Sequence, residues 1–319
     1  VPASITVRIH AGKWFLSFCN DDLSVYPTEA EIMAELATWS ADELMPVTVG
    51  LDRGVVVPLY TSNQQQFVLK SSEQRRLKRR GRWIKQWQRR AAKRTQGSRR
   101  WKKARHKMAR YQAYAGNVRK NFAHQVSHQL VTLSDIKTRL FVFEALRVKN
   151  MTKKPRAKQD EHGRWQKNYA RQKAGLNKAI LASAWGQMVI FSQYKALKMN
   201  KLVVKVDPAG SSQECDPCGH THPDNRLTQS EFVCLRCGHT DNADHNATQI
   251  LKKRGVAYVL SGKKAKVSKK TLRMKKRDSG TELAALATGL TDEGDAVRLS
   301  TVVDSQKHAS LNLSDAAYH

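Results

Sequence analysis

Long apolar runs, scattered cysteines and acidic residues are all scarce in this chain of 319 residues. No run of 18 apolar residues occurs, so we expect neither a membrane span nor a signal peptide. Five cysteines, four of them clustered, do not suit a secreted disulfide framework and favour a reducing cytosol. Lys and Arg number 57 against 27 Asp and Glu, which gives a net charge of +30. This surplus favours nucleic acid as a partner over a membrane surface.

The most unbalanced segment runs from Lys70 to Lys120 and holds 21 basic residues against one acid, Glu73. Apolar residues recur there at helical spacing, so we predict two long basic helices that break near Gly97. Such a charge density favours contact with a nucleic-acid backbone over a merely solvated face. Interleaved aromatics such as Trp87 either pack between the helices or stack on bases. The candidate contact residues are Arg79, Arg80, Lys85, Arg89, Arg90, Arg99 and Arg100.

Four cysteines form two C-x2-C pairs that are fifteen residues apart, which is the spacing of a four-thiolate zinc site. These residues are Cys215, Cys218, Cys234 and Cys237. We expect the zinc to be structural, because four protein ligands leave no open position. Arg236, between the last two cysteines, either contacts a phosphate or faces solvent. His124 and His128 are four residues apart, but no third ligand is near them, so we favour two polar helix positions.

Three carboxylates lie where α/β proteins often place chemistry. Asp52 lies within a β-branched strand, Glu144 ends an apolar strand, and Asp244 opens a helix expected over residues 246–254. Such a trio could hold two divalent cations, and Mg²⁺ fits because it prefers oxygen ligands. Simpler readings stay open: Asp52 could accept backbone hydrogen bonds beside Gly54, and Glu144 could reach solvent.

The rest of the pattern supplies an order of elements. Alternation predicts a hairpin over 4–19. In the sheet it predicts a strand over 46–52, a second apolar run over 55–57 after a turn at Gly54, and a third short strand over 63–70. A helix over 174–198 and a strand over 201–207 follow. Three strands, a helical insert, a strand, a helix, a strand and a last helix match the element order of the ribonuclease H-like fold. Beyond that helix no sustained periodicity appears, apart from a possible short helix near 281–287, so we expect 255–319 to be largely disordered.

Four segments carry a resemblance to a known family: VGLDRGVV (49–56), FVFEAL (141–146), VDPAGSSQECDPCGH (206–220) and FVCLRCGHTDNADHNATQIL (232–251). In this order they resemble the split RuvC-type nuclease domain and zinc ribbon of the transposon-encoded TnpB (OrfB) proteins, relatives of the type V CRISPR effectors. Residues 4–19 resemble the closing strands of that family's guide-binding barrel. The family's N-terminal recognition lobe and half of its barrel have no counterpart in the printed sequence, and Thr248 stands where a second alanine is more usual.

The resemblance implies an α/β, ribonuclease H-like (RuvC-type) nuclease domain with inserts, preceded by a partial β-barrel. The expected parts are the barrel remnant 1–27, a linker 28–45, the nuclease domain 46–254 with a basic helical insert 70–134, a lid 147–173 and a zinc ribbon 211–240, and the tail 255–319.

The resemblance also implies RNA-guided, Mg²⁺-dependent DNA cleavage by a transposon-encoded endonuclease in the prokaryotic cytoplasm, at the nucleoid. Asp52, Glu144 and Asp244 would be the catalytic acids and would bind two Mg²⁺ ions, and the four cysteines would hold structural zinc. The partners would be a guide RNA and a target DNA, with no membrane. Two alternatives remain: a nucleic-acid binder without cleavage activity, and a carboxylate-type transposase.

Overall fold

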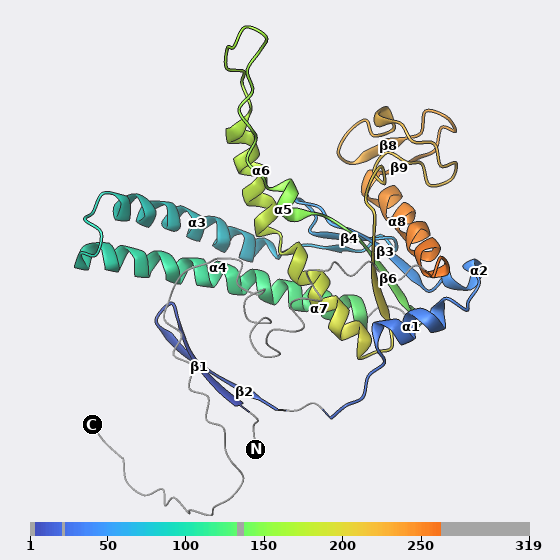
Figure 1. Cartoon of the computed structure of the whole chain (residues 1–319), viewed down its shortest axis with the longest axis horizontal. Helices are drawn as coiled ribbons and strands as arrows, with labels where there is room; N and C mark the ends of the chain where they lie inside the picture. The colour runs from blue at the N-terminus through green and yellow to red at the C-terminus, as the bar shows by residue number, and fades with distance from the viewer. Residues whose placement is uncertain (1–3, 21–22, 133–136, 263–319) are drawn as a thin grey trace, which may run out of the picture. The chain divides into compact units, whose positions relative to one another are not determined.

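The computed structural model describes residues 4–20, 23–132 and 137–262 (Figure 1). The chain divides into two units, one reaching Ser24 and one starting at Val25, and each is described by itself. The expected disorder of 263–319 and the possible helix near 281–287 lie outside the described residues.

The first unit is an antiparallel hairpin of β1 (Ser4–His10) and β2 (Lys13–Cys19). Its two-residue turn has positive φ at Ala11 (51°) and Gly12 (78°), as a tight hairpin turn of this length requires. The predicted hairpin is therefore confirmed. No third strand pairs with it within the described part of this unit, so the partial barrel stays a prediction.

The second unit is built on a five-stranded sheet in the order β5-β4-β3-β6-β7. The middle strand β3 pairs in parallel with β6, and β6 pairs in parallel with β7, whereas β4 and β5 run antiparallel. The carboxyl ends of three strands therefore meet at one edge of the sheet. The strands are β3 (Thr48–Asp52), β4 (Leu59–Thr61), β5 (Gln66–Phe67), β6 (Leu140–Glu144) and β7 (Leu202–Val206).

Helices cover both faces of this sheet (Figure 1). On one face, Phe141 and Phe143 of β6 are buried with residues of α4 (Arg99–Thr132) and α7 (Trp185–Leu197). On the other, Leu140 and Val142 are buried with residues of α1 (Glu29–Leu36), α2 (Ala41–Leu44) and α8 (Ala243–Leu260). A strand that is apolar on both faces, as β6 is, needs a helical layer on each side.

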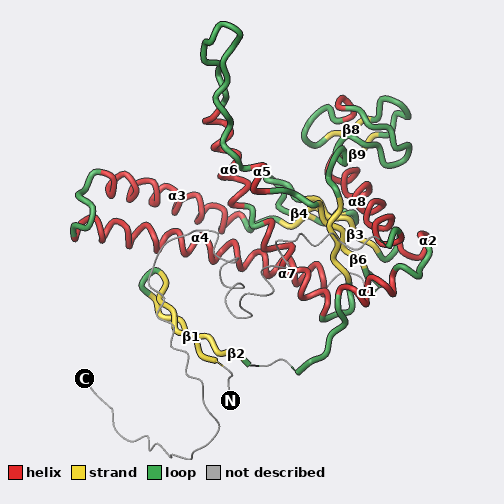
Figure 2. The backbone as a smooth tube through the Cα atoms, viewed as in Figure 1, coloured by secondary structure: helices red, strands yellow, loops and turns green. Residues whose placement is uncertain are grey.

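A long helical hairpin extends from the sheet and is made of α3 (Ser71–Ala92) and α4 (Figure 2). The two helices pack against each other, and the chain turns between them at Gly97, where φ is +83°. Buried residues of the two helices include Ala91 of α3 and, one turn apart on α4, Ala104 and Met108. The two predicted basic helices are thus confirmed. The second helix continues without a break to Thr132.

Two further expectations need correction. The segment 28–45, expected as a linker, forms α1 and α2, and its Ile32, Leu36 and Leu44 are at most 1% exposed in the core. The apolar run 55–57 is not a strand. Pro58 follows it and has no N–H to donate to a ladder, and the second strand begins only at Leu59.

The helix expected over 174–198 is two helices, α6 (Ala170–Ala182) and α7. Ala184 breaks them because its φ of +58° lies in the left-handed region, which no α-helix can continue through. The last helix extends to Leu260, beyond the expected end at 254, so the predicted tail begins within α8. The expected lid contains a short helix, α5 (Val148–Met151), and an isolated bridge between Gln159 and Trp165. Among the described residues, no helix is both long and apolar enough to cross a membrane.

Candidate active site

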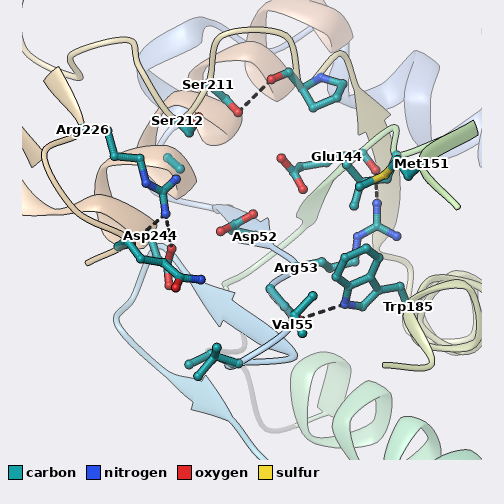
Figure 3. Close-up of a pocket in the computed structure, with 17 residues that line it drawn as sticks. Asp52, Arg53, Val55, Glu144, Met151, Trp185, Ser211, Ser212, Arg226 and Asp244 are labelled. Atoms are coloured by element: carbon teal, nitrogen blue, oxygen red, sulfur yellow. Dashed lines mark hydrogen bonds and ion pairs between the residues drawn. The ribbon is translucent and has the colours of Figure 1, made fainter. Parts of the chain in front are cut away.

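The three predicted carboxylates line one cavity of about 250 Å³ (Figure 3). Asp52 ends β3 and Glu144 ends β6, and the parallel pair Leu51–Phe143 places these next residues side by side. Asp244 lies in the first turn of α8, where Asn242 caps the helix by accepting hydrogen bonds from the N–H groups of Asp244 (3.0 Å) and His245 (3.2 Å). An acid in a first helical turn is favoured by the helix dipole.

The three acids disfavour one another's charges. Burial raises the pKa of Glu144 to about 8, with the negative charge of Asp52 adding to the rise. Burial also raises the pKa of Asp52, to which repulsion from Asp244 contributes, and burial raises that of Asp244. Carboxylates pushed together in this way gain most when a cation joins them. The donor set is made of oxygens alone, which suits a hard divalent ion such as Mg²⁺.

Arg53 is a buried cation beside Glu144 and close to Asp52, and sequence reasoning missed it. It is 8% exposed, and its guanidinium donates to the backbone carbonyl of Glu144. Burial lowers the pKa of Arg53, and the carboxylates of Glu144 and Asp52 raise it again. Its guanidinium carbon also lies 5.7 Å from the ring centre of Phe143. Arg53 therefore offsets part of the negative charge in the cavity.

Arg226 brings a second cation from the cysteine-rich segment to the same cavity. Its guanidinium lies 3.5 Å from a carboxylate oxygen of Asp244 and donates to the carbonyl of Gln229 at 2.7 Å. Figure 3 shows Arg226 pointing toward Asp244. It lowers the pKa of Asp244 against the effect of burial. The cysteine-rich segment thus contributes directly to the acidic cavity.

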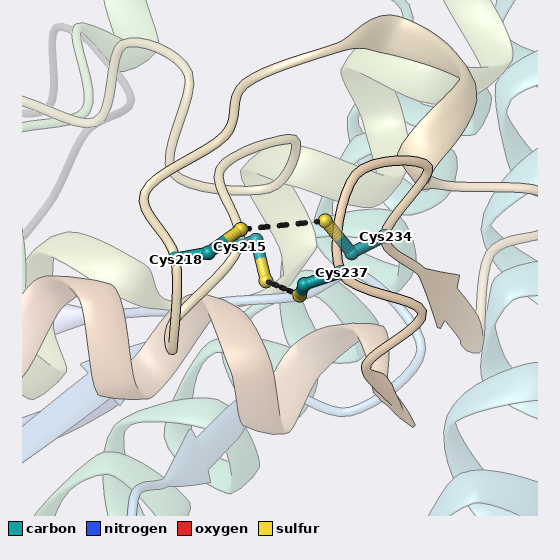
Figure 4. A group of neighbouring side chains, drawn as sticks. All are labelled: Cys215, Cys218, Cys234 and Cys237. Atoms are coloured by element: carbon teal, nitrogen blue, oxygen red, sulfur yellow. Dashed lines mark hydrogen bonds between the residues drawn. The ribbon is translucent and has the colours of Figure 1, made fainter.

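The four predicted cysteines come together, with their sulfur atoms all within 4.8 Å of one another (Figure 4). The Sγ atoms of Cys215 and Cys237 are 3.6 Å apart, as are those of Cys218 and Cys234. A tetrahedral ion with bonds of about 2.3 Å places its sulfur ligands roughly 3.8 Å apart. The geometry therefore fits a four-thiolate zinc site, and no disulfide forms among them.

This cysteine-rich segment is tied to α8 by Asn246, which is fully buried. The Asn246 side chain accepts from the Asp216 N–H at 2.9 Å and donates to the Glu214 carbonyl at 2.7 Å. Ion pairs Arg254–Glu214 (2.5 Å) and Lys253–Asp216 (3.0 Å) reinforce the attachment. Because α8 also carries Asp244, the cysteine site and the acidic cavity share one support. The segment's own strands are β8 (Glu231–Val233) and β9 (Thr240–Asn242), with a 3₁₀ turn at Pro223–Asn225.

The basic candidates lie mostly at the surface. Arg80 is half-buried and stacks on Tyr114, with 3.6 Å from its guanidinium carbon to the ring centre. Two tryptophans of the α3–α4 hairpin also differ in burial. Trp83 is 43% exposed, whereas the indole N–H of Trp87 is buried. Exposed basic candidates are Arg79, Lys85, Arg89, Arg90, Arg99, Arg100 and Arg236.

The two histidines of the helical pair do not converge. His124 stacks on Phe191 with ring centres 3.8 Å apart, and the exposed His128 contacts Thr132. Among the described residues, the ligand atoms of the four cysteines form a compact group, and neither histidine belongs to it. The sequence could have indicated Arg53 and Arg226 only through their neighbours: one follows Asp52, and the other lies between the cysteine pairs.

Fold and cavity together define an α/β protein with a three-carboxylate cavity and a four-cysteine metal-binding group. Residues 31–155 match the family model OrfB_IS605, described as "Probable transposase", and residues 185–251 match the model "Cas12f1-like, TNB domain". These matches confirm the predicted resemblance to the TnpB (OrfB) family.

Three proteins with descriptions of their own are similar in sequence to this chain. The chain is 32% identical over 262 residues to "Putative RNA-guided DNA endonuclease InsQ" of Escherichia coli (strain K12), covering 82% of this chain and 59% of that protein. It is 28% identical to a "Putative RNA-guided DNA endonuclease" of Streptomyces pristinaespiralis, covering 82% and 55%. A stretch of 56 residues is 43% identical to "CRISPR-associated endodeoxyribonuclease Cas12f1" of Sulfoacidibacillus thermotolerans, covering 18% of this chain and 13% of that protein. The chain thus spans less than two thirds of the length of these relatives.

Proposed function

We propose that this chain is a metal-dependent DNA endonuclease of ribonuclease H-like (RuvC-type) fold, directed to its target by a guide RNA. The observation that carries the proposal is the convergence of Asp52, Glu144 and Asp244 on one cavity from three separate parts of the chain. The relatives described as RNA-guided DNA endonucleases support the choice of guide RNA and target DNA as partners. Such an enzyme would act in the prokaryotic cytoplasm, on nucleoid DNA.

The three acids would hold two Mg²⁺ ions, which would supply an activated water and stabilise the leaving oxygen. Around them the chain's own groups have distinct tasks. Asp52 and Glu144 define the rigid side of the site because both end paired strands. Asp244 comes from α8, and Arg226 holds its carboxylate in place from the cysteine-rich segment. The four cysteines would hold zinc as a staple that keeps Arg226 at the cavity.

The α3–α4 hairpin would hold the guide–target duplex by its backbone, while base pairing supplies the sequence. Its exposed Arg and Lys side chains carry charge without an acidic helix to neutralise them, since α3 contains a single acid, Glu73. The segment 147–173 would act as the lid over the acids. Its α5 lies at the cavity, because Met151 is among the lining residues.

The test is to purify the protein with the RNA it holds, sequence that RNA, and assay cleavage of a matching DNA with Mg²⁺. We expect cleavage by the wild-type protein and its loss in Asp52→Ala, Glu144→Ala and Asp244→Ala, each of which should keep RNA binding. Random bound RNA with no guided cleavage would favour a non-cleaving binder. DNA products joined to new ends would favour a transposase. Residual guided cutting by pure Asp244→Ala protein would refute the site assignment.

A further inference from the structure

A second hollow, of about 290 Å³, lies beside the acidic cavity. The two share a wall, because Val55 and Val56 line both. The second hollow is lined largely by apolar groups, among them Phe122 of α4 and Ala182 of α6. Its volume is near the lower end for small-molecule sites, which suits a single flat ring system.

One basic side chain, that of Arg119, borders this apolar hollow. Arg119 of α4 is half-buried, and burial lowers its pKa. Within the described part of the chain, the side chain of Arg119 makes no hydrogen bond or ion pair. Keeping a guanidinium partly out of water without an acid is unfavourable unless a ligand compensates. An anionic group bound at the mouth of the hollow would supply that compensation.

The hollow lies between two features already described, the α3–α4 hairpin and the acidic cavity. Leu69 and Gln74 line it at the start of α3, where the basic hairpin leaves the sheet, and Val55 and Val56 separate it from the acids. Val56 is 74% exposed, so this wall presents apolar surface to whatever passes over it. A nucleic-acid strand running from the hairpin to the acids would cross the hollow.

We propose that this hollow receives the base of a nucleotide next to the cut phosphate, with Arg119 bound to that nucleotide's phosphate. The ligand class is a single DNA strand with one base turned out of its stack. The inference rests on the proposed function, since the acids define which phosphate is cut. Apolar walls can take any base, because every base has an apolar face. The contact would therefore set the strand's position and not its sequence.

A binding test uses the full chain with its RNA in a Glu144→Gln background, which should not cut, and single-stranded DNA carrying 2-aminopurine at one position at a time. We expect fluorescence to rise at one position, as that base leaves its neighbours. Ala182→Trp should fill the hollow and remove the rise, and Arg119→Gln should weaken binding about tenfold. The controls are Leu181→Trp and Lys178→Gln, two exposed positions on α6, outside the α3–α4 hairpin. Thermal unfolding checks that each variant is folded.

A cleavage test gives an independent readout with the wild-type Glu144. An abasic nucleotide is placed at each position around the cut, and we expect about tenfold slower cutting at one position only. In Ala182→Trp, intact and abasic substrates should be cut at the same reduced rate. Equal 2-aminopurine signals at every position, or an Ala182→Trp variant that behaves as wild type, would overturn the inference while guided cleavage stands. A position-specific signal without any cleavage by wild-type protein would support the hollow and refute the proposed function.

Discussion

Gly50 of β3 lies directly beneath the backbone of Thr248 in α8. A Cβ atom added to Gly50 would sit 2.0 Å from the Thr248 carbonyl oxygen, closer than any real contact. The relation is repeated in the opposite sense, since a Cβ on Gly255 of α8 would sit 2.1 Å from a methyl group of Val142 in β6. Two glycines thus let α8 approach the sheet at backbone distance, and Asp244, in the first turn of that helix, joins Asp52 and Glu144 at one cavity.

Gly50→Ala should therefore push α8 from the sheet. We expect a loss of about 1–3 kcal/mol of unfolding free energy, as for an overpacked core, together with weaker cleavage because Asp244 moves. Urea unfolding and the guided cleavage assay measure the two effects. Gly116→Ala is the control: Gly116 lies within α4 with nothing within 4 Å of an added Cβ, so that variant should be as stable as wild type or more so. Equal stability of both variants would contradict the close approach.

Glu144→Gln separates catalysis from stability. The amide keeps the shape of the side chain but removes the charge, which burial and Asp52 disfavour. We expect cleavage to be lost, whereas the metal-free variant should unfold at a temperature equal to or above that of wild type. Cleavage assays with Mg²⁺ and thermal scans in a chelator test this. A large loss of metal-free stability would show that the ionised Glu144 holds the fold together.

The raised pKa of Glu144 predicts how metal-free stability depends on pH. The folded protein binds this proton up to a pKa of about 8, whereas the reference value for a free Glu is 4.5. The unfolded chain ionises first, so the free energy of unfolding falls as pH rises through this interval. Mg²⁺ must displace the proton, and its stabilising effect should therefore grow from pH 6 to pH 8. Thermal scans at several pH values, with and without Mg²⁺, measure both trends. Glu144→Gln should flatten both pH dependences. If the variant and the wild type show identical pH profiles, Glu144 is not the group that titrates.

Cys234→Ser should lose bound zinc and lower the unfolding temperature. Cys234 is 2% exposed and is packed with Phe232 and Ala243, so the ribbon's core and the start of α8 would loosen together. Cys19→Ser is the control, because Cys19 is exposed and belongs to the hairpin unit. Metal analysis by mass spectrometry and thermal scans provide the readouts. A Cys234→Ser protein with full zinc and unchanged stability would exclude the four-thiolate site.

Replacing exposed basic residues of the α3–α4 hairpin should weaken nucleic-acid binding without unfolding the protein. For the combined change of Arg79, Arg89 and Arg99 to Ala, we expect the slope of log affinity against log salt to decrease by about 1 per lost phosphate contact. Filter binding at several salt concentrations measures this slope. Arg80→Ala should instead lower stability, because Arg80 packs on Tyr114. An unchanged salt slope in the triple variant would show that this face does not bind phosphates.

Local patterns in the sequence were sufficient for several elements. The periodic apolar residues of the helical hairpin, the alternation of the N-terminal hairpin and the spacing of the cysteines each depend on neighbours in the chain. The structure confirms these elements. Pattern also placed Glu144 at the end of an apolar strand and Asp52 in a β-branched strand, and the structure shows Asp52 as the last residue of β3.

Local sequence patterns could not predict that these acids lie side by side. The parallel register of β3 with β6 sets Asp52 beside Glu144, and register depends on how distant strands and helices pack. The roles of Arg53, Arg226 and Asn246 also arise only in the folded state, because each contacts groups far away in the sequence. The break at Ala184 and the packing of α1 and α2 likewise depend on tertiary contacts that override local preference. The sequence alone determined which groups are available for chemistry; only the tertiary structure decided which of them share a cavity, since proximity across long loops is a property of the packed core.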